Sequence, residues 1–328
     1  MKPIKLSTIA EVTGGKLLCG DGSRNVDNVV TDSRKLTKDC LFVPLAGEKF
    51  DGHDFIENAF DGGASASLTA KEFSAPTEGR ALILVEDTLR ALQQIAAYYR
   101  GLFPVSVVGL TGSVGKTTTK EMTAAVLERK YRTLKTEGNF NNEIGLPLTV
   151  FRLDDSHQTA VLEMGMSGFG EIGRLSAIAR PDLAMITNIG MSHIELLGSQ
   201  ENIYRAKSEI LQNVKPGGTV IVNGDDAILR AHKEEITHRV YTVGKNGDCD
   251  AVASQVQSDE ASVRFTFSGF GRHFEVVLNI PGEHNVYNAL FAIAAGIHFG
   301  VEDTEIVRAL AKFRPAGMRM DLIPCNGF

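Results

Sequence analysis

The pattern of apolar and polar positions divides this chain into two parts. In the amino-terminal part, short apolar runs at 40–45 and 81–85 stand between turn residues, around a helix-like stretch near 55–60. These runs have the length and the flanking residues of strands. Apolar residues then recur at helical spacing from Leu89 to Tyr99. We therefore expect a small α/β domain that is followed by a connecting helix.

Farther along, apolar strands alternate with helical patterns. The expected strands are 105–110, 159–162, 183–187 and 219–222. Because strands that alternate with helices pair in parallel, this order predicts a doubly wound, mostly parallel sheet. Apolar and polar residues then alternate from Val263 to Leu278 around a turn at 268–271, which predicts a β-hairpin appended to the sheet. The expected fold class is therefore α/β.

Length and composition narrow the class of protein. The chain has 328 residues, which at about 150 residues per domain suggests two domains and part of a third. A hydrophobic content of 43% and four scattered cysteines are typical of a globular protein with reduced thiols. The net charge of -6, without a dense run of Lys and Arg, argues against nucleic acid as a partner. Neither a signal peptide core nor an apolar run of ~18 residues is found, so we expect a cytoplasmic protein without a membrane span.

The segment Gly112–Thr118 reads Gly-Ser-Val-Gly-Lys-Thr-Thr and lies between the strand at 105–110 and a helical pattern. Glycines let backbone N–H groups surround phosphate oxygens, and the start of a helix adds partial positive charge. Lys116 is placed to reach the terminal phosphates, and Thr117 is placed to ligate Mg²⁺. The general phosphate-binding pattern, G-x-x-x-x-G-K-[ST], has glycine at the position of Leu110. The alternative is therefore a chance Gly-Lys-Thr sequence in an ordinary turn. We expect a nucleoside triphosphate to bind here, with contacts from Gly112, Ser113, Val114, Gly115, Lys116, Thr117 and Thr118.

Two polar residues follow the ends of predicted strands. Glu163 comes directly after the apolar run 159–162, and His193 follows the run 183–187. Ligands of parallel sheets collect at the carboxyl ends of the strands, so both side chains should lie near the glycine-rich loop. A carboxylate there can hold a metal ion or its water. The alternatives are a solvated acid at a strand end and an ordinary loop histidine.

Lys207 occupies an awkward position on a predicted helix. Ile203, Ala206, Ile210 and Val214 form one apolar face of this helix, and Lys207 falls near that face. A buried ammonium group is costly unless it is paired or neutralised. The simpler alternative is a side chain that extends to solvent. A buried neutral amine can also react with CO₂, which would turn the cation into an anionic metal ligand.

Asn285 and Asn288 lie at the start of another predicted helix with an apolar stripe. Asn285 fits the position of a helix cap. Asn288 lies one turn later and off the stripe, so it needs a polar partner or solvent. An adenine edge is one candidate partner.

Taken together, these motifs resemble the Mur ligase family, the ATP-dependent enzymes that form amide bonds in peptidoglycan precursors. The segments that carry the resemblance are Thr111–Thr118, Glu163–Gly165, Gly190–Ser199, Ala206–Ile210, Pro281–Asn285 and Asn288–Leu290. The resemblance covers the whole chain and implies a UDP-substrate-binding domain at 1–86 and a central ATP-binding P-loop domain at 87–314. Residues 315–328 would be a linker and the start of a further ligase domain, most of which is missing, so we expect impaired ligation.

The resemblance also implies substrates. The segment Gly138–Thr149 is similar to the substrate loop of members that add D-alanyl-D-alanine to UDP-N-acetylmuramoyl-tripeptide, and Thr31–Arg34 is similar to a uridine-nucleotide-binding segment. The residues implied to contact the UDP-linked peptide are Ser33, Arg34, Asn139 and Asn142. Asp51–His53 fits a plain turn, and we do not interpret it as a metal site. All expected partners are small molecules, and we expect a monomer.

The implied reaction begins with transfer of the γ-phosphoryl group of ATP to the terminal carboxylate of the peptide. The amine of D-alanyl-D-alanine then attacks the acyl phosphate, and Lys116 offsets charge on the phosphoryl oxygens. The implied Mg²⁺ ligands are Thr117, Glu163, His193 and Lys207. Lys207 would bind as a carbamate formed from CO₂. Glu163, His193 and Lys207 are also implied to be catalytic. The implied additional ATP contacts are Asn285, Asn288 and Arg319.

Two other functions fit the same motifs. One is the ligase that adds the third amino acid to the same precursor, which typically has a threonine-rich segment in place of Gly138–Thr149. The other is a non-catalytic module that binds nucleotide and UDP-sugar. A guanine-nucleotide switch is disfavoured, because no Asn-Lys-x-Asp segment follows the glycine-rich loop.

Overall fold

The computed structural model describes residues 1–47, 50–72 and 79–314, which group into two compact units. Unit 1 comprises Met1–Pro104, Glu137–Ser156 and Ala177–Ala179. Unit 2 comprises Val105–Thr136, His157–Ser176 and the chain from Arg180 onward. The expected start of a further domain at 315–328, with Arg319, lies outside the described residues. The functional boundaries at 86 and 314 stay predictions.

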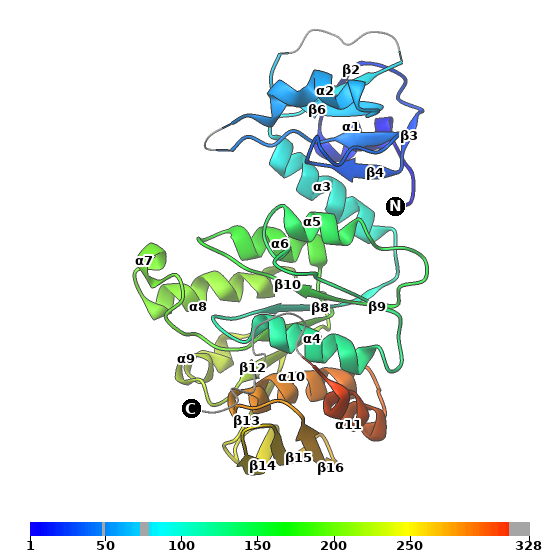
Figure 1. Ribbon diagram of the computed structural model, residues 1–328. Coiled ribbons are helices and arrows are strands. Elements are labelled where there is room, and N and C mark those ends of the chain that lie inside the picture. The colour runs from blue at the N-terminus through cyan, green and yellow to red at the C-terminus, as the bar shows by residue number, and fades with distance from the viewer. Residues whose placement is uncertain (48–49, 73–78, 315–328) are drawn as a thin grey trace, which may run out of the picture. The chain divides into compact units, whose positions relative to one another are not determined.

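Unit 1 is built around a five-stranded sheet in the order β2-β7-β6-β5-β4 (Figure 1). Strands β4 to β7 are parallel to their neighbours, and β2 pairs antiparallel with β7. The strands are β2 (Lys16–Cys19), β4 (Asn28–Val30), β5 (Cys40–Phe42), β6 (Ala66–Thr69) and β7 (Ala81–Leu84), with a separate pair of β1 (Ile4–Lys5) and β3 (Asn25–Val26). This arrangement confirms the small α/β fold expected from the sequence.

The helices of unit 1 are α1 (Leu6–Thr13), the 3₁₀ turn η1 (Gly52–Phe55), α2 (Ile56–Asp61), α3 (Thr88–Gly101) and α5 (Gly145–Val150). Two of them, α2 and α3, match the helical stretches predicted near 55–60 and from Leu89 to Tyr99. Asp87 caps α3 by accepting a hydrogen bond from the backbone N–H of Arg90, which stabilises the helix start. A core between α2 and the sheet includes Ile56, Phe60 and Phe42.

Unit 2 contains a nine-stranded sheet in the order β16-β15-β14-β13-β12-β11-β8-β10-β9. All pairs from β9 to β14 are parallel, whereas β14, β15 and β16 pair antiparallel. The parallel strands are β8 (Ser106–Thr111), β9 (Thr133–Lys135), β10 (Thr159–Glu163), β11 (Leu183–Ile186), β12 (Thr219–Asn223) and β13 (Arg239–Gly244). The predicted mostly parallel sheet is therefore confirmed.

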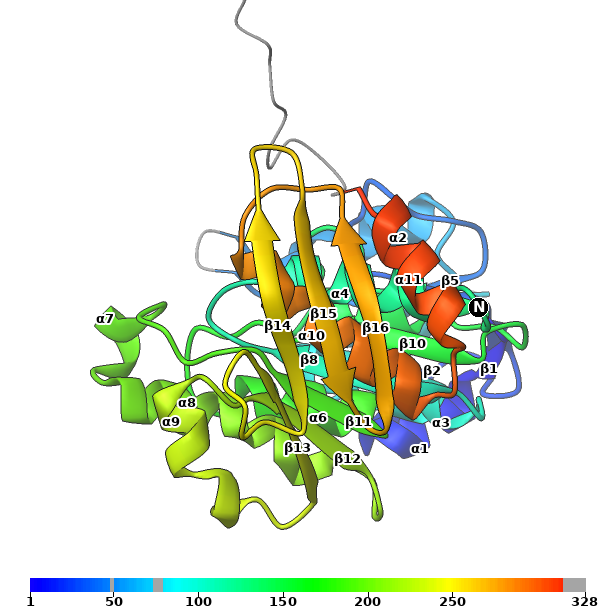
Figure 2. The ribbon, with the colours of Figure 1, turned by 90° about the horizontal axis from the view of Figure 1, so that it is seen from below.

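The predicted hairpin is also present, and a third strand connects it to the parallel part of the sheet. Figure 2 shows β14 (Ala251–Ser258), β15 (Val263–Gly269) and β16 (Arg272–Leu278) side by side, with α11 next to β16. The buried faces of these strands, with Phe265 and Phe267, pack against α10 in the core of unit 2.

Helices cover both faces of the parallel strands, with α4 and α10 on one face and α8 on the other (Figure 1). The unit 2 helices are α4 (Lys116–Leu127), α7 (Ile194–Leu197), α8 (Gln200–Ser208), η2 (Glu209–Asn213), α9 (Ala227–Ala231), η3 (Lys233–Glu235), α10 (His284–His298) and α11 (Asp303–Lys312). Helix α6 (Glu171–Ala179) spans the boundary between the two groups of residues. In the described part of the chain, no helix combines the length and the apolar character that a bilayer crossing requires.

Candidate functional site

The glycine-rich loop connects β8 to α4 and packs tightly on its neighbours. Gly115 precedes α4 with φ 80°, a left-handed conformation that favours glycine. A Cβ atom at Gly115 would lie 2.7 Å from Oδ1 of Asn288, and one at Gly112 would lie 1.9 Å from Oγ1 of Thr187. Both positions therefore require glycine for lack of space.

The end of β11 holds the loop through hydrogen bonds. The backbone N–H of Ser113 donates to the carbonyl oxygen of Asn188 at 3.1 Å, and the N–H of Val114 donates to Asn188 Oδ1 at 3.0 Å. The carbonyl oxygen of Val114 accepts from Asn188 Nδ2 and from Thr187 Oγ1, both at 2.9 Å. The Val114 side chain itself is 64% exposed. Neither supporting residue was predicted, although a Thr-Asn pair at the carboxyl end of an apolar strand is a signal for such a role.

Two lysine side chains converge on one oxygen atom of this loop. Lys116 Nζ donates to the carbonyl oxygen of Gly112 at 2.8 Å, and Lys207 Nζ donates to the same oxygen at 3.0 Å. Lys207 is 2% exposed, so the interpretation that its side chain extends to solvent is wrong. Burial, and then the positive charge of Lys116, lower the pKa of Lys207 to about 7. Burial also lowers the pKa of Lys116. Two lysine side chains at one carbonyl oxygen, the buried Lys207 and the partly buried Lys116, make this a site that favours a polyanion.

Glu163 is the last residue of β10 and is 1% exposed, which excludes a solvated acid. Thr117 Oγ1 donates to Glu163 Oε1 at 3.4 Å. Hydroxyl and carboxylate oxygens are the ligand types that Mg²⁺ prefers. These two side chains therefore fit a magnesium ion next to the loop. Thr118, the last residue of the predicted motif, is partly buried in the first turn of α4.

The structure places His193 in an exposed segment that contacts the loop through its neighbours. Gly190 N–H donates to Ser113 Oγ at 2.8 Å, and Ser192 Oγ donates to the carbonyl oxygen of Ser113 at 3.4 Å. His193 has φ 65° and immediately precedes α7. Among the described residues, no three His, Cys, Asp or Glu side chains are grouped closely enough to hold a metal ion. The role of His193 as a ligand beside Glu163 stays a prediction.

Asn285 and Asn288 are both buried, and Asn288 packs against the loop and α4. Thr119 Oγ1 donates to Asn288 Oδ1 at 3.0 Å, and Asn288 Nδ2 donates to Asn285 Oδ1 at 3.0 Å. Asn285 Nδ2 donates to the carbonyl oxygen of Pro281 at 2.8 Å. Because α10 starts at His284, Asn285 lies inside the helix, and the interpretation as a cap is wrong. Asn288 has the polar partner that its position required, and the predicted ATP contacts of both asparagines stay predictions.

Unit 1 has a pocket of its own, with a volume of about 630 Å³. Its lining residues are Thr31, Asp32, Ser33, Arg34, Phe42, Leu45, Ala46, Gly47, Phe50, Gly52, Phe55 and Ile144. Arg34 donates to the two carboxylate oxygens of Asp32 through Nε and Nη2, both at 2.9 Å. The hydrogen bonds from Arg34 lower the pKa of Asp32 to about 2. The pocket thus combines apolar walls with a polar edge that includes Ser33 and Arg34, two of the four predicted substrate contacts.

Asn142 lies three residues before α5 and shapes the turn that leads into this helix. Its Oδ1 accepts hydrogen bonds from the N–H groups of Ile144 at 3.2 Å and Gly145 at 2.8 Å. These bonds fix the turn that places Ile144 at the pocket wall. Asn139 is exposed, three residues earlier. Direct contact of either asparagine with a substrate stays a prediction.

The turn Asp51–His53 contributes Gly52 to the lining of the pocket. Asp51 Oδ1 accepts from the N–H of His53 at 2.9 Å and from His53 Nδ1 at 2.5 Å. His53 Nε2 accepts from the N–H of Ala70 at 3.0 Å, so the ring proton is on Nδ1. These contacts make His53 a fully bonded structural residue, as expected for a turn.

Known protein families match this chain in both units. The Mur ligase middle domain matches residues 110–296, and the catalytic domain of the Mur ligase family matches residues 25–100. The chain is 45% identical to UDP-N-acetylmuramoyl-tripeptide--D-alanyl-D-alanine ligase of Bacillus subtilis (strain 168) over 319 residues, which cover 97% of this chain and 69% of that protein.

The chain belongs to the Mur ligase family. Solved Mur ligase structures have the same fold. MurF from Acinetobacter baumannii matches this chain with a TM-score of 0.92 at 33% identity. The match covers 98% of this chain and 71% of that chain. MurF ligase from Thermotoga maritima in complex with ADP has a TM-score of 0.80 at 32% identity, with 88% of this chain and 66% of that chain covered. The resemblance predicted from the motifs is therefore confirmed.

Proposed function

We propose that this chain is an ATP-dependent, ADP-forming ligase that adds D-alanyl-D-alanine to UDP-N-acetylmuramoyl-tripeptide. The observation that carries the proposal is the convergence of Lys116 Nζ and Lys207 Nζ on the carbonyl oxygen of Gly112, beside the Thr117 and Glu163 oxygens. This arrangement suits a triphosphate and its metal ion. The similarity to the Bacillus subtilis ligase supports the choice of substrates.

The chemistry proceeds in two steps. A carboxylate oxygen of the peptide attacks the γ-phosphorus of ATP, the bond to the ADP oxygen breaks, and an acyl phosphate forms. The amine of D-alanyl-D-alanine then attacks the acyl carbon, the bond to the phosphate oxygen breaks, and the amine loses a proton as the amide forms. Phosphate leaves far more readily than hydroxide would, which explains the need for ATP.

The residues of the loop act mainly by position and charge. Lys116 turns from the carbonyl oxygen of Gly112 to the β- and γ-phosphates, and backbone N–H groups of the loop surround the β-phosphate. Thr117 and Glu163 hold Mg²⁺, with His193 as a further ligand by analogy with the family. The bound ion adds positive charge at the phosphate oxygens. Asn285 and Asn288 contribute to the nucleoside end of the same site.

Lys207 carries a carbamate in the active protein. A pKa of about 7 leaves roughly half of this amine neutral at pH 7, and only the neutral amine reacts with CO₂. The modification replaces one of two adjacent cations by an anion and supplies a metal ligand. A ¹³C NMR spectrum in ¹³C-labelled bicarbonate should contain a carbamate signal that is absent from Lys207→Arg. A spectrum without this signal would contradict the carbamate and leave the other roles intact.

The pocket of unit 1 receives the UDP end of the second substrate. Its apolar side chains suit a base, and Ser33 and Arg34 provide donors at the polar edge. Asn139 and Asn142 contact the peptide part. A cytoplasmic location belongs to the same proposal, because ATP and UDP-linked precursors are made there.

An ADP-release assay tests the function, with each substrate omitted in turn. We expect ADP release that requires both UDP-N-acetylmuramoyl-tripeptide and D-alanyl-D-alanine. ADP release with the dipeptide precursor and a third amino acid would instead identify the alternative ligase. Calorimetric binding of Mg-ATP and the UDP-tripeptide without ADP release under any combination would identify a non-catalytic binding module.

A further inference from the structure

Lys120 is a fully buried cation one helical turn behind the glycine-rich loop. Its side chain is 0% exposed, and it lies four residues after Lys116 in α4, so both lysines are on one side of the helix. Lys120 Nζ is 3.0 Å from Glu121 Oε1 and 3.9 Å from Glu163 Oε2. Lys120 therefore lies within ion-pair distance of the carboxylate that also contacts Thr117.

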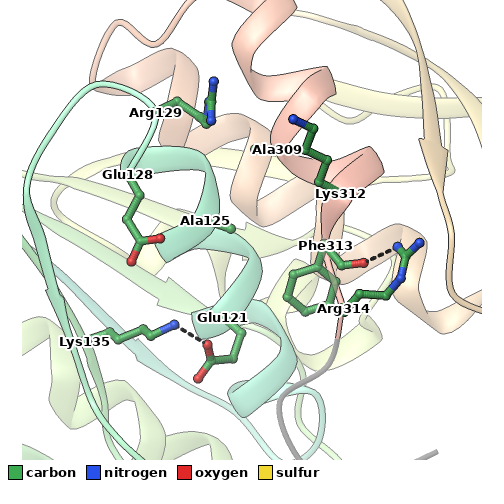
Figure 3. Close-up of a pocket in the computed structure, with 9 residues that line it drawn as sticks. All are labelled: Glu121, Ala125, Glu128, Arg129, Lys135, Ala309, Lys312, Phe313 and Arg314. Atoms are coloured by element: carbon green, nitrogen blue, oxygen red, sulfur yellow. Dashed lines mark hydrogen bonds and ion pairs between the residues drawn. The ribbon is translucent and has the colours of Figure 1, made fainter. Parts of the chain in front are cut away.

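A second lysine continues this series of charges. Lys135 Nζ on β9 is 2.6 Å from Glu121 Oε2, as the dashed line in Figure 3 marks. We call Glu163, Lys120, Glu121 and Lys135 the ion-pair chain. Burial alone would raise the pKa of Glu121, but hydrogen bonds from Lys135 and Lys120 lower it. The ion-pair chain ends at a groove of about 560 Å³ between α4 and α11, whose lining includes Glu121, Lys135 and Lys312 (Figure 3).

The fold itself does not need an ammonium group at position 120. The stem of a buried lysine fills space as an apolar side chain would, while its charge costs several kcal/mol to desolvate unless it is paired. The pairing partner nearest to the loop is Glu163, which is itself buried. An ion pair between these two buried groups favours one arrangement of the carboxylate.

We propose that Lys120 is a positioning residue, which holds the Glu163 carboxylate beside Thr117 and so preforms the site for the metal-bound nucleotide. The inference rests on the proposed nucleotide site. The Glu121 carboxylate, itself paired with Lys135, holds the Lys120 ammonium group from the other side. Removal of Lys120 then weakens metal binding although Lys120 touches neither metal nor nucleotide.

A double-mutant cycle tests this inference in the full chain. Calorimetry gives the affinity for an ATP analogue with a non-hydrolysable β,γ bond, with Mg²⁺ and with EDTA, for the wild type, Lys120→Met, Glu163→Gln and the double variant. We expect Lys120→Met to reduce the Mg²⁺-dependent affinity about tenfold, in the range known for residues that orient metal ligands, and to leave the affinity in EDTA unchanged. In the Glu163→Gln background, the same substitution should have no further effect on Mg²⁺ dependence.

Lys215→Met is the matched control. Lys215 forms an ion pair with Asp182 at 2.8 Å, and Asp182 accepts from the N–H of Val107 at the opposite end of β8 from the loop. Its removal also breaks a lysine–carboxylate pair but should leave nucleotide affinity unchanged.

Three results would overturn the inference. The first is that Lys120→Met and Glu163→Gln change the Mg²⁺-dependent affinity for the analogue independently of each other. The second is that Lys120→Met weakens binding of the analogue equally with Mg²⁺ and with EDTA. The third is that Lys120→Met leaves the Mg²⁺ dependence of this affinity unchanged. If Lys120→Met does not fold, the double variant decides, since removal of the Glu163 charge should restore folding and a second unfolded protein would contradict the proposal. Failure of the wild type to bind the analogue with Mg²⁺ would instead contradict the proposed function.

Discussion

Thr119 and Asn288 are 169 positions apart in the chain, and Thr119 Oγ1 donates a hydrogen bond to Asn288 Oδ1 at 3.0 Å. Thr119 belongs to the first turns of α4, and Asn288 to the first turns of α10. Their bond places an amide oxygen against Gly115, where no side chain fits. The glycine-rich loop is therefore shaped by a helix that begins far away in sequence.

Thr119→Val should destabilise unit 2, because it leaves the buried oxygen of Asn288 without its donor. We expect a loss of about 1–3 kcal/mol in the free energy of unfolding, measured by urea denaturation. Thr37→Val is the control, since it removes a Thr–Asn hydrogen bond of 2.9 Å to Asn28 at the exposed surface. The control should change stability by less than about 0.5 kcal/mol. Equal effects of the two substitutions would contradict a buried role for the Thr119 bond.

Gly115→Ala should abolish nucleotide binding, since its Cβ atom would displace the Asn288 amide and change the loop. Gly198→Ala provides a control for backbone strain alone. Gly198 has φ 78°, close to the 80° of Gly115, but a Cβ there would meet no atom within 4 Å. We expect Gly198→Ala to cost about 1 kcal/mol of stability and to bind Mg-ATP normally by calorimetry. Normal binding by Gly115→Ala would show that the loop tolerates the contact.

Lys207→Met should raise the unfolding temperature of the nucleotide-free protein in bicarbonate-free buffer. The substitution removes the buried member of the two lysine side chains that share the carbonyl oxygen of Gly112. Mg-ATP should then raise the unfolding temperature less than in the wild type, because stabilisation by a ligand follows its affinity. Lys215→Met, which breaks a half-exposed pair with Asp182, should lower the unfolding temperature slightly. A similar decrease in Lys207→Met would contradict the repulsion between the two lysines.

Arg34→Met should raise the pKa of Asp32 from about 2 toward its ordinary value of 3.8. The folded pKa lies below the ordinary one, so the pair stabilises the protein above pH 3.8, and this contribution is lost as the pH falls through about 2. Carboxyl ¹³C NMR titration measures the shift directly. Asp259, whose pKa is lowered by the backbone N–H groups of Ala261 and Ser262, should titrate identically in both proteins. An unchanged Asp32 titration would show that Arg34 is not its main partner.

Long apolar strands and helical stripes were readable from the sequence because burial on a parallel sheet leaves a continuous apolar run. Strand β10, for example, was predicted at 159–162 and observed at Thr159–Glu163. Strands β9, β13 and β14 were missed. Strand β9 has only three residues, and β14 is mostly exposed beyond Ala253, with a left-handed residue at Gln255, so neither has a clear apolar pattern. For such strands, the partner strand decides the conformation.

The sequence by itself determined the Mur ligase motifs, the parallel order of the central strands and the presence of Lys116, Thr117 and Glu163 at one edge of the sheet. These follow from local patterns and from the rule that parallel strands end on the same side. Only the tertiary structure decided that Lys207 points inward to Gly112, that Asn288 supports the loop instead of facing solvent, and that Lys120 reaches Glu163. Helical spacing defines the face of a helix, but the direction of a long polar side chain depends on the charges and the space that other elements bring to it.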